Sequence, residues 1–130
     1  RFAYSLLPHS GSWSEQTARE AYALNDPLIT YAAEQASDGS GLDSLFACAA
    51  ENVMIETIKR AENGKGLIVR LYEFQRKRGA IRLECGFNVA EVWRSNLIED
   101  DQEQVSTDGN HIDLFLKPYE IVTLRIIPAQ

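Results

Sequence analysis

The sequence predicts a mainly β protein, an antiparallel β-sandwich with one short helix near its N-terminus. Apolar and polar residues alternate in several short runs, most clearly in Ile81–Phe87 and Ile112–Leu116. Glycine, proline or clustered charges interrupt these runs at short intervals, as they do between the strands of a sandwich. A single run near the start, Ser14–Leu24, has helical spacing instead.

The N-terminal third predicts two strands around this helix. Phe2–Leu7 is expected as a strand that Pro8 ends, and Leu28–Ala33 as another. Ser12, followed three residues later by Glu15, fits a capping box at the start of the helix. The helical spacing is carried by Ala18, Ala21 and Tyr22, and Asn25 and Pro27 end the helix. Ser37–Gly41 predicts a flexible turn.

The middle of the chain contains the strongest strand signal. Leu67–Phe74 has apolar or amphipathic residues on both faces, as a buried central strand has, and we expect the ring of Tyr72 to be largely buried. Leu45–Ala49 predicts a short strand before it. Asn52–Arg60 fits a helical stripe about as well as a strand, and Glu62–Gly66 could cap a helix or turn a hairpin.

The last third predicts further strands joined by polar turns. Three adjacent cations in Gln75–Gly79 indicate a solvated hairpin tip, and Glu99–Glu103 an acidic turn. Pro118 separates the strand Ile112–Leu116 from the last one. The remaining expected strands are Ile81–Phe87, Val89–Ile98 and Ile121–Ile127, so that the chain contains about eight or nine.

Composition limits the classes of partner. The 130 residues are enough for one domain, and a net charge of -6 disfavours nucleic acid and anionic membranes. No apolar run reaches the ~18 residues of a membrane span. The chain starts at Arg1 and has Met54 as its one methionine, so we expect a piece of a longer polypeptide. Cys48 and Cys85 lie in apolar settings and are expected as buried free thiols, which favours the cytoplasm.

The run from Ile58 to Glu73 resembles the "IKxAExGxGLIxRLYE" signature in the C-terminal region of family 38 glycoside hydrolases, the zinc-dependent alpha-mannosidases. Other segments agree with that family in the expected order: Tyr4–His9 with Gly11 and Trp13, Ala21–Leu28, Asn96–Leu97 and Pro118–Arg125. The resemblance spans nearly the whole chain. It implies that Asn52–Arg60 is a strand and not a helix. The chain differs from the family's pattern locally, at Leu7 and at Phe46–Ala50.

The resemblance implies that residues 1–130 form a single C-terminal accessory β-domain of a larger alpha-mannosidase polypeptide, which hydrolyses alpha-mannosidic bonds. Zinc and the nucleophilic aspartate of the family belong to its catalytic domain, so we expect no catalytic residue, metal site or cofactor in this chain. The expected partner is the catalytic domain of the same polypeptide. A carbohydrate-binding module and a structural or oligomerisation module are the alternatives.

The residues that could carry chemistry each have a simpler structural interpretation. His9 and His111 lack partners at zinc-ligand spacing and are expected in turns or at the surface. Asp100 and Asp101, flanked by Glu99 and Glu103, are interpreted as a solvated patch. Glu73 and Glu120 each follow a tyrosine; we expect the tyrosine ring to be half-buried, and the carboxylate to meet a cation or a backbone amide at a strand end.

Aromatic, thiol and basic groups complete the candidates. Trp13 and Trp93 could stack on a sugar ring, but Trp13 lies in the family's "PHxGxW" pattern and is interpreted as a core anchor. No histidine is placed by sequence beside either cysteine to make a nucleophile. The cluster Arg76–Arg78 could reach a neighbouring surface, where a rim contact contributes little.

Overall fold

The computed structural model describes residues 3–30, 32 and 44–129. The chain divides into two compact units, residues 1–41 and 42–130, and each is described by itself.

The described part of the first unit contains one helix, α1 (Glu15–Asn25), close to the predicted bounds. The capping residues differ from the prediction. The helix starts after Ser14, whose backbone N–H donates to the hydroxyl of Thr17 at 3.1 Å, so Ser14 and Thr17 replace Ser12 and Glu15.

The two strands predicted in this unit are absent from its described residues. Residues 3–7 and 28–30 form no ladder, while Phe2, Tyr31 and Ala33 lie outside the description, as does the turn predicted at Ser37–Gly41. Alternating apolar residues favour a strand only where a partner strand can satisfy the backbone, and no described segment pairs with these residues.

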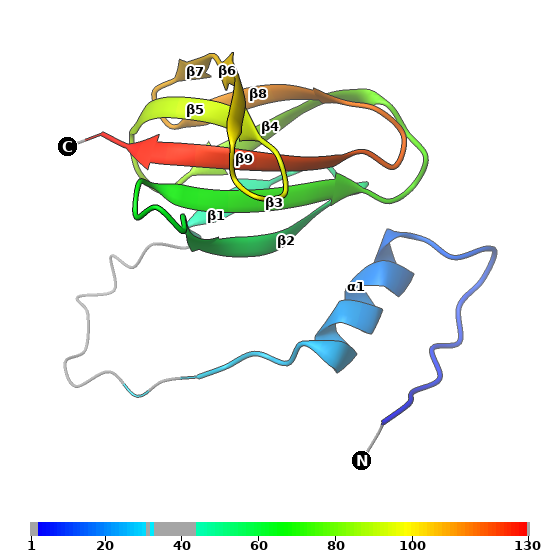
Figure 1. Cartoon of the computed structure of the whole chain (residues 1–130). Helices are drawn as coiled ribbons and strands as arrows, with labels where there is room; N and C mark the ends of the chain where they lie inside the picture. Colours follow the sequence, from blue (N-terminus) through cyan, green and yellow to red (C-terminus); the bar gives the residue numbers. More distant parts are fainter. Residues whose placement is uncertain (1–2, 31, 33–43, 130) are drawn as a thin grey trace. The chain divides into compact units, whose positions relative to one another are not determined.

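The second unit is an antiparallel β-sandwich, which confirms the predicted fold class. One sheet has the strand order β1-β4-β8-β7 and the other β2-β3-β9-β5-β6 (Figure 1). The strands of the first sheet are β1 (Phe46–Cys48), β4 (Gly79–Cys85), β7 (Thr107–Asp108) and β8 (His111–Leu116). Those of the second are β2 (Val53–Arg60), β3 (Leu67–Glu73), β5 (Val89–Ser95), β6 (Asp101–Val105) and β9 (Ile121–Pro128).

The core lies between the two sheets and follows the alternation of their strands. In β3, Val69 and Leu71 face it, opposite Leu124 and Val122 of β9. The first sheet contributes the alternate residues of β4 and β8, among them Leu83, which is fully buried. Strand β9 is therefore central to the larger sheet, with β3 on one side and β5 on the other (Figure 1).

The ambiguous stretch before β3 is a strand, as the family resemblance implies. β2 pairs antiparallel with β3 from Val53 to Arg60, with an irregularity between Ile55 and Thr57. That irregularity shifts the alternation by one residue, which explains why a simple period of two fits the segment poorly.

Two connections differ from the prediction. Residues 75–79 do not close a hairpin, because β3 pairs with β2 and β9, whereas β4 pairs with β1 and β8; the segment crosses from one sheet to the other. The predicted acidic turn Glu99–Glu103 is half strand: β6 begins at Asp101 and pairs with β5, which itself ends at Ser95. The two-residue strand β7 was not predicted.

Candidate functional site

Glu73, at the end of β3, has the most buried carboxylate of the described chain, with 1% of the residue exposed. Its Oε1 accepts hydrogen bonds from Asn52 Nδ2 at 3.0 Å and from the Gln75 backbone N–H at 2.7 Å. Its Oε2 accepts from the Tyr119 backbone N–H at 2.9 Å. The carboxylate thus joins the start of β2, the end of β3 and the turn between β8 and β9.

These donors determine the charge state of Glu73. Burial raises the pKa of the carboxyl group, but the bonds from Tyr119, Asn52 and the backbone amides of Lys77 and Gln75 outweigh it and lower the pKa to about 2. A carboxylate that stays ionised and saturated with donors cannot protonate a leaving group, so Glu73 is unsuited to general acid catalysis.

Glu120, which was predicted with Glu73 to bind at a strand end, also holds the turn between β8 and β9. Its Oε2 accepts from the Lys117 backbone N–H at 2.7 Å, and its Oε1 receives Arg94 Nη1 at 3.2 Å. Both carboxylates therefore meet a cation or backbone amides at strand ends, as predicted. The half-buried ring expected beside each carboxylate is confirmed for Tyr72, which is therefore less buried than the largely buried ring also predicted for the central strand. It was wrong for Tyr119, which has a positive φ of 59° and is 60% exposed.

A second polar cluster, the Arg125 network, lies on the outer face of the five-stranded sheet. Arg125 points away from the core on β9 and is nevertheless only 3% exposed. Its Nε donates to Asp101 Oδ1 at 2.7 Å, its Nη1 to Asn63 Oδ1 at 2.9 Å, and its Nη2 to the Glu99 carbonyl. Ser95 also donates to Asp101, at 2.8 Å. The network joins the β2–β3 loop, the β5–β6 loop and β9.

Glu99 extends this network to β2. Its Oε1 lies 2.8 Å from Lys59 Nζ, and its Oε2 accepts the Glu62 backbone N–H at 2.8 Å. The Lys59 and Glu62 bonds hold the pKa of the Glu99 carboxyl below its usual range. For Asp101, burial acts to raise the pKa, and the bonds from Arg125 and Ser95 lower it overall. The interpretation of the acidic cluster as solvated was therefore wrong for Glu99, whereas Asp100, Asp101 and Glu103 are exposed.

The structure assigns the histidines and cysteines to separate surroundings. His9 is exposed in the first unit, and His111 begins β8 in the second. Within the described residues, no three side chains of histidine, cysteine, aspartate or glutamate gather into a group that could hold a metal. Both cysteines are free thiols, Cys85 buried and Cys48 half-buried, and burial raises the pKa of Cys85 to about 11. That thiol stays protonated and is a poor nucleophile.

The aromatic residues do not form a row on the sheet. Trp93 of β5 is half-buried and lies opposite Arg125, in the row that contains Ile68. Tyr72 belongs to a different row, opposite Met54 and Ile121. Trp13 is 55% exposed in the first unit, so its interpretation as a core anchor was wrong for the described chain. Arg76, Lys77 and Arg78 are exposed in the crossing between sheets, as expected for a solvated segment.

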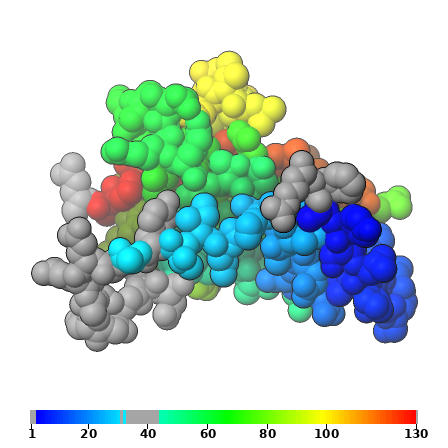
Figure 2. Space-filling model, turned by 90° about the horizontal axis from the view of Figure 1, so that it is seen from below, coloured from blue at the N-terminus to red at the C-terminus, as the bar shows by residue number. Residues whose placement is uncertain are grey.

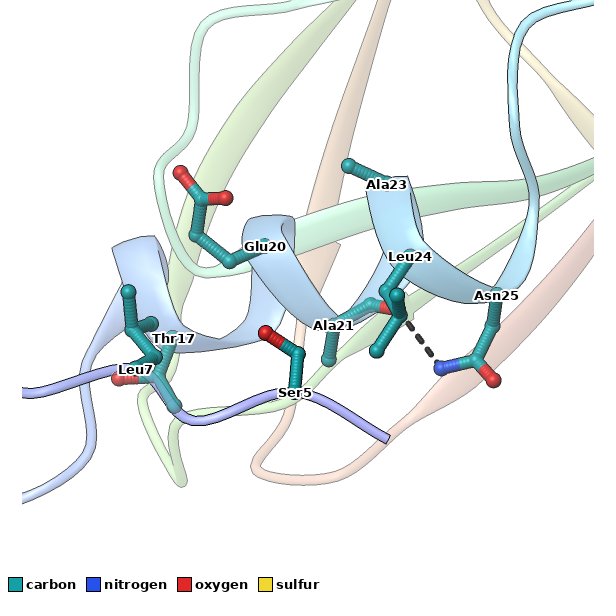
Figure 3. Close-up of a pocket in the computed structure, with 8 residues that line it drawn as sticks. All are labelled: Ser5, Leu7, Thr17, Glu20, Ala21, Ala23, Leu24 and Asn25. Atoms are coloured by element: carbon teal, nitrogen blue, oxygen red, sulfur yellow. Dashed lines mark hydrogen bonds between the residues drawn. The ribbon is translucent and has the colours of Figure 1, made fainter. Parts of the chain in front are cut away.

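The first unit contains a pocket of about 410 Å³ between its N-terminal segment and α1 (Figure 3). Leu7, Ala21 and Leu24 give it an apolar wall, and Glu20 is the one charged group that lines it. Asn25 closes back onto the helix by donating to the Ala21 carbonyl at 2.8 Å (Figure 3). A single carboxylate supplies neither the pair of carboxylates that a glycosidase needs nor a set of metal ligands. The 11-residue α1, the helix of the described residues, is too short and too polar to cross a membrane.

Sequence reasoning missed the Arg125 network. Its members are separated by 24 residues between Asp101 and Arg125 and by 62 between Asn63 and Arg125, and no local motif connects them. An arginine flanked by apolar residues in β9 was the available signal, because a buried arginine requires carboxylate and carbonyl partners.

The fold and these bonded carboxylates define an antiparallel β-sandwich domain whose acidic side chains fix turns. The family model for the C-terminal β-sandwich domain of family 38 glycosyl hydrolases matches residues 52–124, more than half of the chain. The chain belongs to this family.

Relatives of known name agree. The chain is 28% identical to alpha-mannosidase 2C1 of Homo sapiens and 30% identical to that of Mus musculus, over 97% of its own length in each case. It is 29% identical to alpha-mannosidase G of Dictyostelium discoideum over 98% of its length. It spans only 13% of the first two relatives and 12% of the third.

Proposed function

We propose that residues 1–130 make up the non-catalytic C-terminal accessory domain of an alpha-mannosidase-like polypeptide, which hydrolyses alpha-mannosidic bonds with zinc held in a separate catalytic domain. Family membership and the names of the relatives support the parent activity. The accessory role rests on the hydrogen bonds of Glu73. This residue has the most buried carboxylate of the described chain, and its oxygens accept from two backbone amides and from an asparagine side chain.

The proposed role is to support the catalytic domain of the same polypeptide. A sandwich whose buried Glu73 and Arg125 each make several hydrogen bonds is a stiff body, and a stiff body stabilises a neighbour at little entropic cost. We further propose the cytoplasm as its compartment, because Cys48 and Cys85 are both free, and reduced thiols persist there. Oligomer formation stays a secondary proposal.

Deletion in the intact polypeptide tests this function. Removal of residues 42–130 should shorten the half-life of aryl alpha-mannosidase activity on heating, and the separately produced 130-residue chain should hydrolyse no aryl alpha-mannoside. A deletion variant that loses activity no faster than the full polypeptide would contradict the supporting role. Turnover by the isolated chain above background would contradict the non-catalytic one.

A further inference from the structure

The turn between β2 and β3 contains the one asparagine of the sequence that is followed by glycine, Asn63-Gly64. Figure 2 shows this green segment at the surface of the second unit, beside the yellow atoms of the β5–β6 loop. Asn63 and Gly64 are both exposed, and no heavy atom of the described chain, its own neighbours aside, lies within 4 Å of the position that a Cβ on Gly64 would occupy. Water and hydroxide therefore reach both residues.

An asparagine that precedes glycine can modify itself. The Gly64 nitrogen gives its proton to hydroxide and attacks Cγ of Asn63. The new C–N bond closes a five-membered imide, and the side-chain nitrogen of Asn63 takes a proton from water and leaves as ammonia. Water then opens the imide at either of its two carbonyls, which gives aspartate or isoaspartate. Glycine favours the ring closure because it has no side chain to obstruct the attack and the most freedom in its backbone.

Three hydrogen bonds hold the reacting groups in the folded chain. The Gly64 N–H, which must lose its proton, donates to the Ala61 carbonyl at 2.9 Å. Asn63 Oδ1 accepts from the Lys65 N–H and from Arg125 Nη1, each at 2.9 Å. The proton that must leave and the amide that must rotate are thus both engaged.

Arg125 binds the turn on both sides of Gly64. Its Nη1 donates to the Lys65 carbonyl at 3.3 Å as well as to Asn63. The arginine is only 3% exposed, and Asp101 and the Glu99 carbonyl hold the rest of its guanidinium. A buried group with this many partners leaves its place only by local unfolding. Release of the Asn63 side chain is therefore coupled to opening of the Arg125 network.

We propose that Asn63-Gly64 is a site of spontaneous deamidation that the Arg125 network keeps closed in the native chain. Each opening of the β2–β3 turn exposes Asn63 to ring closure, and the product records that opening covalently. Aspartate keeps an oxygen that accepts from Lys65 and Arg125. Isoaspartate inserts one more carbon atom into the main chain, so the turn does not regain these bonds with the same spacing.

Incubation of the 130-residue chain at mildly alkaline pH, in native buffer and in urea, tests the site. Peptide mass spectrometry should show deamidation of Asn63 at least about tenfold more slowly in native buffer, because a turn that opens at a cost of about 1.4 kcal/mol or more reacts only from its open state. Asn96 is the matched control: its side chain also accepts from two turn N–H groups, but Leu97 follows it, so it should stay unmodified over the same time. Equal rates at Asn63, or no modification in urea, would overturn the proposal.

Arg125→Lys tests whether the network is the gate. Lysine keeps the charge but lacks the fork that joins Asn63 to Lys65, so deamidation in native buffer should speed up by about tenfold or more. A variant that is folded by circular dichroism and deamidates no faster than the wild type contradicts the gating role. Should Arg125→Lys fail to fold, Asp101→Ala, which removes one partner of Arg125, replaces it with the same expected direction.

The two products should differ in stability. Asn63→Asp should keep the wild-type midpoint in urea, because a carboxylate accepts the same bonds from Lys65 and Arg125. A chain that has been deamidated in urea and refolded also contains isoaspartate, and it should unfold at a lower urea concentration than Asn63→Asp. Equal midpoints for the two would overturn the proposed effect of isoaspartate on the turn.

Discussion

Replacement of Glu73 by glutamine tests the central polar contact of the sandwich. The amide can keep one oxygen for Asn52 and Gln75, but its NH2 group then faces the Tyr119 N–H, which leaves buried donors unpaired. An unsatisfied buried donor costs about 1–3 kcal/mol, and loss of charge weakens the remaining bonds, so we expect Glu73→Gln to lower the free energy of unfolding by about 3 kcal/mol at pH 7.

The pH dependence gives an independent check. The pKa of Glu73 falls from 4.5 to about 2 on folding, and a difference of this size corresponds to a stabilisation of up to about 3 kcal/mol. Because the folded pKa is the lower one, the stabilisation is fully present above about pH 4.5 and is lost as the pH falls through about 2.

Urea denaturation of the isolated chain at pH 7 and pH 3 measures both effects. The difference between wild type and Glu73→Gln should shrink by about 2 kcal/mol at the lower pH. Glu103→Gln, a change of an exposed carboxylate on β6, should have little effect at either pH. Equal midpoints at pH 7, or a difference that does not change with pH, would refute the assignment of these bonds to an ionised Glu73.

Four further predictions use the same chain. Gly66→Ala should destabilise the fold more than Gly64→Ala in urea melts: both glycines have positive φ, which costs alanine about 1–2 kcal/mol, but only at Gly66 would the new Cβ lie 2.4 Å from the Ile126 carbonyl oxygen. Arg125→Ala should cost about 3–5 kcal/mol by the same measurement, since it leaves buried acceptors unpaired. Tyr72→Ala should cost about 1–3 kcal/mol, less than for a fully buried ring, because the residue is half-buried; equal midpoints would place the ring in solvent. The dialysed chain should contain no stoichiometric zinc by elemental analysis.

The strands with apolar alternation were predictable from sequence, whereas the polar edge strand β6 and the two-residue edge strand β7 were not. Val69 and Leu71 identify β3 because a strand covered on both faces needs apolar residues throughout. β6 reads Asp-Gln-Glu-Gln-Val and has a single apolar residue, so an edge strand of this composition looks like a turn. Phe2–Leu7 shows the opposite error, since a strand-like pattern says nothing about whether a partner strand is available.

The candidate site was predictable only for local contacts. Glu73 and Glu120 stand at strand ends next to turns, where a carboxylate commonly accepts backbone amides, and this was inferred correctly. The burial of Glu99 and the bonding of Asp101 depend on Arg125, which is far away in the sequence and reaches them only after β9 lies between β3 and β5. The charge of a residue can be read from sequence, but its desolvation depends on the completed sheet.

The central place of β9 in the five-stranded sheet also has a consequence for the synthesis of the chain. Of the nine strands of the described chain, β9 leaves the ribosome last, yet it is the one that separates β3 from β5. Until it inserts, β2 and β3 on one side and β5 and β6 on the other are two separate antiparallel pairs with unpaired inner edges. Such edges are prone to pairing with other chains. A nascent chain stalled before residue 121 would therefore be the species most in need of a chaperone.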